Sequence, residues 1–223
     1  TRVRDLVERS FAGLSGTGEQ RLEAPPQVVP STVIRNKELE QSHVCLGTGS
    51  YRQDHAERYS SYVLNTILGG SMSSRLFQNV REKRGLAYAV FSGLSAYQDA
   101  GALSIYAGCA NEVVAELIDV VVAEIRQIKS QGMDEAELRR AKDHLKGSLM
   151  LSLENTGSRM SHLARQEIYY GRQFSMDEIL GGIEGVLGDD VQRIANEIFQ
   201  GELTASVLGN LQGYSPQPSQ LRL

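Results

Sequence analysis

The chain has 223 residues, of which 41% are hydrophobic and 22% are charged, and its formal net charge is -4. Such a chain is long enough to bury a core as one large domain or two small ones. The acidic balance argues against nucleic acid or an anionic membrane as the main partner, because phosphate binding requires a positive surface. No stretch approaches the roughly 20 apolar residues of a membrane-spanning helix.

The first thirty residues differ in composition from the rest. Apolar residues recur at helical spacing from Val3 to Leu14, and the following segment is rich in Gly, Pro and charge. The chain does not begin with Met, and we expect it to be a piece of a longer protein. The predicted division is a helix over 1–14 that closes a preceding domain, a linker over 15–30, a domain over 31–211 and a flexible polar tail over 212–223.

Within this domain the patterns predict strands and long amphipathic helices. The expected strands are 32–38, 42–48, 88–97, 102–109 and 203–208. The expected helices are 55–68, 74–83, 113–128, 134–153, 158–170, 176–182 and 189–199. A turn at 98–101 joins two of the strands as a hairpin, and hairpins combined with long helices predict an α+β fold, with an antiparallel sheet covered on one face by helices.

Side chains able to bind metal do not form a recognisable motif. The four histidines, His43, His55, His144 and His162, are not paired at the i, i+4 spacing with a nearby Glu that a zinc-peptidase helix requires. We therefore predict no metal ligand in this chain. The two cysteines, Cys45 and Cys109, each lie in an apolar run, and we expect two buried thiols whose redox state the sequence leaves open.

One segment, residues 68–92, combines several unusual features. Its sequence LGGSMSSRLFQNVREKRGLAYAVFS contains a Gly-Gly break, a Ser-rich cap, a basic helix, a Gly stop and a strand. A turn at Gly85 would bring the guanidinium of Arg81 and the phenol of Tyr88 to one rim, suited to gripping an extended peptide. Alternatively, Arg81 only complements the helix C-terminus and Tyr88 is a core aromatic; spacing alone favours this second interpretation.

The same segment resembles the C-terminal half of M16 peptidases, the pitrilysin, insulinase and mitochondrial processing peptidase family. The resemblance continues through YQDAGALSIYAG, DEAELRRAKDHLKGSLMLSLENTGSRM and ARQEIYYGRQFSMDEI, and it covers roughly residues 33–209. It implies one half of a clamshell, with the fold of LuxS and mitochondrial processing peptidase metallohydrolases. The inverted H-x-x-E-H zinc motif belongs to the N-terminal half and is not in this sequence.

The resemblance also implies the function and the site residues. It implies the substrate-binding half of a zinc endopeptidase that hydrolyses peptides or small unfolded proteins, with Zn²⁺ held by the N-terminal half in the same chain or in a partner subunit. Arg81 and Tyr88 match an Arg and a Tyr that contact the scissile peptide, and Gly69, Gly70 and Ser71 would contact substrate. This chain by itself would be inactive.

An alternative within the same family is a non-catalytic subunit. Such a subunit completes the site of a heterodimeric peptidase or serves as a scaffold. The expected partners are the N-terminal half and a peptide. No nucleic-acid partner and no membrane span are expected, and the sequence leaves open whether the protein forms a homo-oligomer. The expected location is the bacterial cytoplasm or periplasm.

Overall fold

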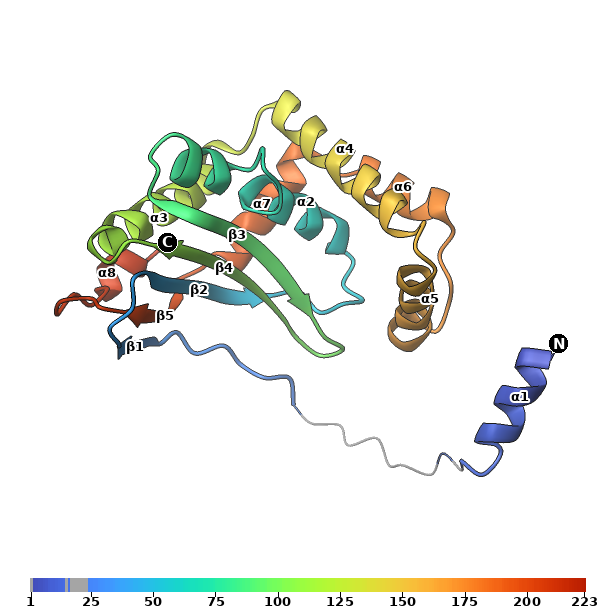
Figure 1. Cartoon of the computed structure of the whole chain (residues 1–223). Coiled ribbons are helices and arrows are strands. Elements are labelled where there is room, and N and C mark those ends of the chain that lie inside the picture. Colours follow the sequence, from blue (N-terminus) through green and yellow to red (C-terminus); the bar gives the residue numbers. More distant parts are fainter. Residues whose placement is uncertain (1, 15, 17–23) are drawn as a thin grey trace.

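The computed structural model describes residues 2–14, 16 and 24–223, and its main body is one sheet with helices packed on one face (Figure 1). The strands are β1 (Thr32–Asn36), β2 (Ser42–Ser50), β3 (Ala87–Ala96), β4 (Gly101–Cys109) and β5 (Thr204–Gly209). The helices are α1 (Arg2–Phe11), α2 (Arg58–Leu68), the π-helix η1 (Phe77–Glu82), the 3-10 helix η2 (Asn111–Val113), α3 (Val114–Gln131), α4 (Glu135–Ser152), α5 (Thr156–Tyr170), α6 (Met176–Glu184), α7 (Gly188–Ile198) and α8 (Pro218–Leu221).

The five strands lie in the order β1-β5-β2-β4-β3. Every neighbouring pair is antiparallel except β1 with β5, which is parallel and aligns Thr32 with Ala205. The predicted α+β class, with a sheet covered on one face, is confirmed, and the parallel pair at one edge is the departure from a purely antiparallel sheet. β3 forms the opposite edge, so one side of its backbone has no neighbouring strand.

The alternation of side chains along β4 explains the one-sided packing. Leu103, Ile105 and Ala107 are buried under the helices, whereas Ser104 and Tyr106 point to the other face. This inner face and the apolar stripes of α2, α3 and α7 form the main core. Each Leu or Ile side chain that is fully buried there stabilises the fold by about 1.5–3 kcal/mol. In the described part of the chain, no helix covers the outer face of the sheet (Figure 1).

Side-chain caps set the first residues of three helices. The carboxylate of Asp134 accepts a hydrogen bond from the Glu137 amide at 2.7 Å, and Asn155 and Ser175 cap α5 and α6 in the same way. A cap of this kind contributes about 1 kcal/mol. The predicted positions of these helices agree with the structure to within about two residues.

The C-terminal segment is folded against the domain, which differs from the flexible tail expected over 212–223. Leu221 is fully buried, and its carbonyl accepts a hydrogen bond from the Leu203 amide at 3.0 Å. The amide of Leu223 donates to the Gly201 carbonyl at 2.8 Å. Pro218 begins the short helix α8 at the position where Pro is tolerated, and a few apolar side chains hold an otherwise polar segment in place.

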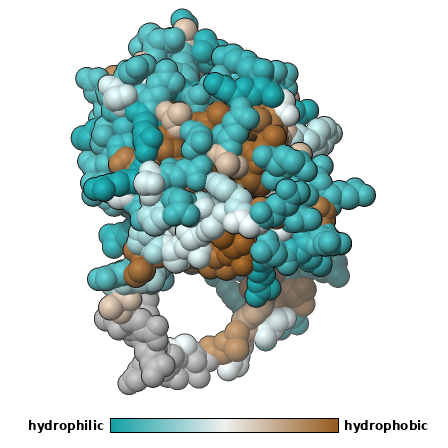
Figure 2. All heavy atoms as spheres, turned by 90° about the vertical axis from the view of Figure 1, so that its left-hand side faces the viewer, coloured by the Kyte–Doolittle hydropathy of each residue, from teal (hydrophilic) through white to brown (hydrophobic). Residues whose placement is uncertain are grey.

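The N-terminal helix α1 confirms the predicted helix, and all of its described side chains are exposed. Residues 15 and 17–23 of the predicted linker lie outside the described residues, and the assignment of α1 to a preceding domain stays a prediction. The side of the domain that carries α8 and the β1 edge is mainly hydrophilic, with separate apolar areas (Figure 2). None of the helices in the described ranges is long and apolar enough to cross a membrane.

The two cysteines have different environments, which corrects the prediction of two buried thiols. Cys109 is buried at the end of β4, and burial raises the pKa of its thiol to about 11. Cys45 is exposed, because it pairs with Tyr106 and therefore lies on the uncovered face of the sheet. An apolar run in a strand does not identify which residues face the helices when small residues occupy both faces.

Candidate functional site

The side chains of Arg81 and Tyr88 meet at the edge of the sheet. The guanidinium carbon of Arg81 lies 5.0 Å from the centre of the Tyr88 ring and 4.8 Å from that of Phe77, both within cation–π range. Tyr88 is 79% exposed. The alternative in which Tyr88 is a core aromatic is therefore wrong, and the pair forms an exposed rim.

The backbone between the two residues explains their approach. Gly85 has φ +62°, a left-handed conformation that glycine adopts without strain. Its amide donates to the Arg81 carbonyl at 3.1 Å, and the Leu86 amide donates to the Val80 carbonyl at 2.9 Å. This turn ends the helix and starts β3 within a few residues, so that the side chain of Arg81 lies over that of Tyr88.

Both residues lie on local irregularities of the backbone. Arg81 is in η1, which is a π-helix instead of the predicted α-helix. Tyr88 is the extra residue of a β-bulge, because Ala87 aligns with Cys109 and Ala89 already aligns with Gly108. π-helical turns and bulges redirect side chains and occur frequently at functional sites. The sequence contains no direct signal for either irregularity.

A polar network anchors the start of this basic helix. Arg75 donates to the two carboxylate oxygens of Glu137 at 2.8 and 2.7 Å and to the Gly132 carbonyl at 2.7 Å. Asn79 donates to the buried carboxylate of Glu124 at 2.7 Å. Because these partners belong to α3 and α4 and the turn between them, the helix that carries Arg81 is tied to the helical layer as well as to the sheet.

We expect Glu124→Gln to stabilise the protein more at pH 7 than at pH 4.5. Burial raises the pKa of Glu124, and the Arg75 guanidinium opposes this effect. When the pKa of an acidic side chain is higher in the folded than in the unfolded protein, ionisation of that side chain destabilises the folded protein. The free energy of unfolding then falls as pH rises from the unfolded-state pKa, about 4.3, to the folded-state pKa, and the loss is complete above the folded-state pKa. The Gln side chain keeps the acceptor for Asn79 and does not ionise.

Urea unfolding of the variant and the parent chain at the two pH values measures this difference. The exposed Glu154→Gln is the matched control. An equal effect of Glu124→Gln at both pH values would contradict the prediction.

The Gly-Gly break lies directly beneath β3. Gly69 is buried, and its carbonyl accepts a hydrogen bond from the Ser92 amide at 3.1 Å. Gly70 is exposed, and the hydroxyl of Ser71 lies 3.2 Å from that of Ser73. The predicted contact of Gly69, Gly70 and Ser71 with substrate stays a prediction; Gly69 also has a packing role that sequence analysis did not identify.

The uncovered face of the sheet next to the pair carries aromatic side chains. Phe91 on β3 and Tyr106 on β4 are cross-strand neighbours with ring centres 5.2 Å apart. The Tyr106 hydroxyl lies 2.8 Å from Nδ1 of His43 on β2. These three side chains form a row across the sheet, and they offer a partly apolar surface beside Arg81 and Tyr88.

The described residues of this chain do not fit a zinc site. Among the residues described, no three His, Cys, Asp or Glu side chains are grouped so that they could hold a metal ion. His43 contacts Tyr106, His162 contacts Gln166 at 2.7 Å, and His55 stacks on Tyr51 with ring centres 4.0 Å apart. His144 is exposed on α4. The histidines therefore lie in separate parts of the domain.

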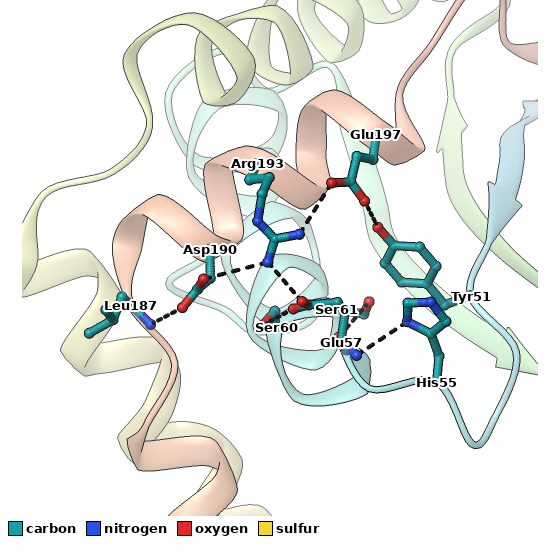
Figure 3. Close-up of polar contacts among 9 residues, drawn as sticks. All are labelled: Tyr51, His55, Glu57, Ser60, Ser61, Leu187, Asp190, Arg193 and Glu197. Carbon is teal, nitrogen blue, oxygen red and sulfur yellow. Dashed lines mark hydrogen bonds and ion pairs between the residues drawn. The ribbon is translucent and has the colours of Figure 1, made fainter.

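Near His55, three carboxylates form ion pairs with one arginine (Figure 3). Arg193 on α7 contacts Glu57 at 2.8 Å, Glu197 at 3.2 Å and Asp190 at 3.5 Å. Tyr51 donates to the other oxygen of Glu197, and this hydrogen bond is the main cause of the lowered pKa of Glu197. The cluster joins the start of α2 to α7, and it is a structural network.

Comparisons with known proteins identify the class to which this fold and rim belong. Residues 1–145 match the family model described as "Peptidase M16 inactive domain". The chain therefore belongs to the M16 peptidase family, as the C-terminal type of domain. The predicted family and fold are thus confirmed.

Two curated relatives illustrate the extent of the similarity. The chain is 39% identical over 193 residues to "Uncharacterized zinc protease YmxG" of Bacillus subtilis, which covers 86% of this chain and 47% of the relative. It is 39% identical over 214 residues to "Uncharacterized zinc protease Mb2805c" of Mycobacterium bovis, which covers 96% of this chain and 48% of the relative. The chain spans about half the length of these relatives.

Solved structures show the same fold at low sequence identity. A peptidase M16 inactive domain from Pseudomonas fluorescens superposes with a TM-score of 0.83 and 21% identity, over 97% of this chain and 53% of that chain. A chain of complex III2 from Candida albicans gives a TM-score of 0.83 and 19% identity, over 97% of this chain and 55% of that chain. At these identities the likeness concerns the fold.

Proposed function

We propose that this chain is the substrate-binding half of a zinc endopeptidase that cleaves peptides or small unfolded proteins. The zinc ion would be bound by a second M16 half, in the same chain or in a partner subunit, and it would supply the metal-assisted hydrolysis. The names of the curated relatives support a zinc protease. The observation that carries the proposal is the exposed Arg81–Tyr88 rim, built on a π-helix and a β-bulge.

The geometry suits the recognition of an extended peptide. β3 is an edge strand. Its Ser92 amide already donates to the Gly69 carbonyl, and the other outward backbone groups can pair with a peptide while the adjacent aromatic row contacts peptide side chains. The Tyr88 hydroxyl would donate a hydrogen bond to the oxyanion that develops at the scissile carbonyl. The guanidinium of Arg81 would hold a neighbouring substrate carbonyl; its contact with Glu82 is 3.6 Å long and exposed, and therefore weak.

Cleavage of a quenched fluorescent peptide library tests the proposal. The complete protein, containing the second M16 half, is assayed with and without a zinc chelator, and the 223-residue chain is assayed beside it. We expect cleavage that the chelator abolishes, and no cleavage by the 223-residue chain. Absence of cleavage by the folded, zinc-supplemented complete protein would reject this proposal in favour of a non-catalytic M16 subunit.

A further inference from the structure

A hollow lies on the helical side of the domain, between α2, α4, α5 and α6. Its volume is about 260 Å³, and none of the residues of the Arg81–Tyr88 rim lines it. Leu145 and Leu149 of α4 and Ile179 and Ile183 of α6 contribute apolar side chains to its wall. An apolar cavity of about 150 Å³ holds benzene, so this hollow has room for a body somewhat larger than one aromatic ring.

The charged side chains that line the hollow are basic. Arg58 and Arg165 contribute guanidinium groups, and no Asp or Glu is among the lining residues. The guanidinium of Arg58 is held by aromatic rings, at 4.4 Å from the centre of Tyr59, 5.3 Å from Phe174 and 5.4 Å from Tyr170. Within the described part of the chain, neither arginine forms an ion pair with a carboxylate.

The carboxylate of Glu178 lies near enough to interact electrostatically with Arg58, but it is already paired with Arg172 at 2.6 Å. The positive charge of Arg58 therefore lies against an apolar cavity without a dedicated counter-ion. Placing a charge in such an environment favours the binding of an anion.

The neutral polar groups of the hollow include one hydroxyl that can still donate and one Gln–His pair. The Tyr62 hydroxyl accepts a hydrogen bond from Gln53 at 3.3 Å, and no acceptor for its own proton is found among the described residues. The Gln166 side-chain oxygen accepts from the Phe174 amide at 2.8 Å, so its NH₂ group faces Nε2 of His162 at 2.7 Å. Nε2 is then the acceptor of this hydrogen bond.

From these observations we propose that the hollow is a binding site for a small apolar carboxylate. The carboxylate is held by Arg58, Arg165 and the Tyr62 hydroxyl, and the apolar body lies against the α4 and α6 side chains. Two sources share this chemistry: the C-terminal residue of a peptide with a large apolar side chain, and a free apolar acid. The site is separate from the proposed peptide-cleaving rim, and it does not depend on the proposed function.

Isothermal titration calorimetry of the 223-residue chain tests the site. The probes are N-acetyl-L-phenylalanine, which represents a peptide C-terminus, its amide, which lacks the charge, and octanoate, which represents a free acid. We expect saturable binding of N-acetyl-L-phenylalanine and about tenfold weaker binding of the amide. Equal binding of octanoate indicates a site for apolar acids in general, and weaker binding of octanoate indicates a site for peptide termini.

Three variants locate the binding. Arg58→Gln removes the charge held by the aromatic rings, and Arg165→Gln removes one from an exposed position of α5, where packing is not disturbed. Each should weaken binding of the acid about tenfold and leave binding of the amide unchanged. Arg139→Gln, at an exposed position of α4 outside the hollow, is the matched control and should have no effect.

Three results would overturn the proposal. The first is equal affinity for N-acetyl-L-phenylalanine and its amide. The second is an equal loss of affinity in Arg165→Gln and Arg139→Gln, which would indicate a general charge effect. The third is the failure of both acids to bind.

Discussion

Under the proposed function, Tyr88→Phe in the complete protein is expected to lower kcat by about 10²–10³-fold and to change KM little. A hydrogen bond to the oxyanion is made in the transition state and not in the ground state, and the loss of one such donor has an effect of this size. The exposed Tyr88 ring already has Arg81 over it, and Phe retains that contact. Steady-state kinetics on a single quenched peptide measure the change.

The matched control is Tyr97→Phe, which removes the hydroxyl of another exposed tyrosine just beyond the other end of β3. It should leave kcat and KM near the parent values. A Tyr88→Phe enzyme with unchanged kcat would contradict the assigned role. A rise in KM at constant kcat would instead indicate that Tyr88 contributes only to substrate binding.

Gly69→Ala is expected to destabilise the domain by about 1–3 kcal/mol. A β-carbon at this position would lie 2.5 Å from the Ser92 amide nitrogen, a backbone atom of β3 that cannot move independently of the strand. The residue is buried, and its carbonyl is bonded to the same amide. Either α2 or β3 must shift. Urea unfolding followed by circular dichroism measures the loss.

Gly93→Ala is the matched control, because Gly93 also lies on β3 and a β-carbon there meets no atom within 4 Å. Glycine inside a strand is less favourable than Ala by about 0.5–1 kcal/mol, so this variant should be neutral or slightly stabilising. If Gly69→Ala were equally neutral, the close packing of α2 against β3 would not restrict this position, and the prediction would be wrong.

Elements with a strong local pattern were predictable from the sequence. The long helices α3 and α4 have regular apolar spacing and, in α4, an acidic N-terminal cap, and the β3–β4 hairpin has a short turn between alternating strands. The tail was not predictable, because Leu221 is one apolar residue in a polar segment and is buried only by contacts with residues far away in the sequence.

The candidate site was predictable in part. The spacing of Arg81 and Tyr88 around Gly85 left two interpretations open and by itself favoured a core Tyr88. The resemblance to M16 peptidases favoured the exposed pair, and the two side chains do meet. The π-helix and the bulge each depend on one additional residue in a turn or strand, which tertiary packing selects and local propensity does not encode. The hollow near Arg58 combines four helices, and periodicity along one helix does not show which side chains of the others face it.

The position of β5 in the sheet affects the order in which the domain can be completed during synthesis. β5 lies between β1 and β2, although it follows them in the sequence by more than 150 residues. Until β5 leaves the ribosome, β1 has no strand to pair with, and one edge of β2 is open. An open edge of this kind can pair with other chains. The nascent domain is therefore most prone to aggregation just before β5 is synthesised, when the core helices are already present and the place of β5 between β1 and β2 is still empty.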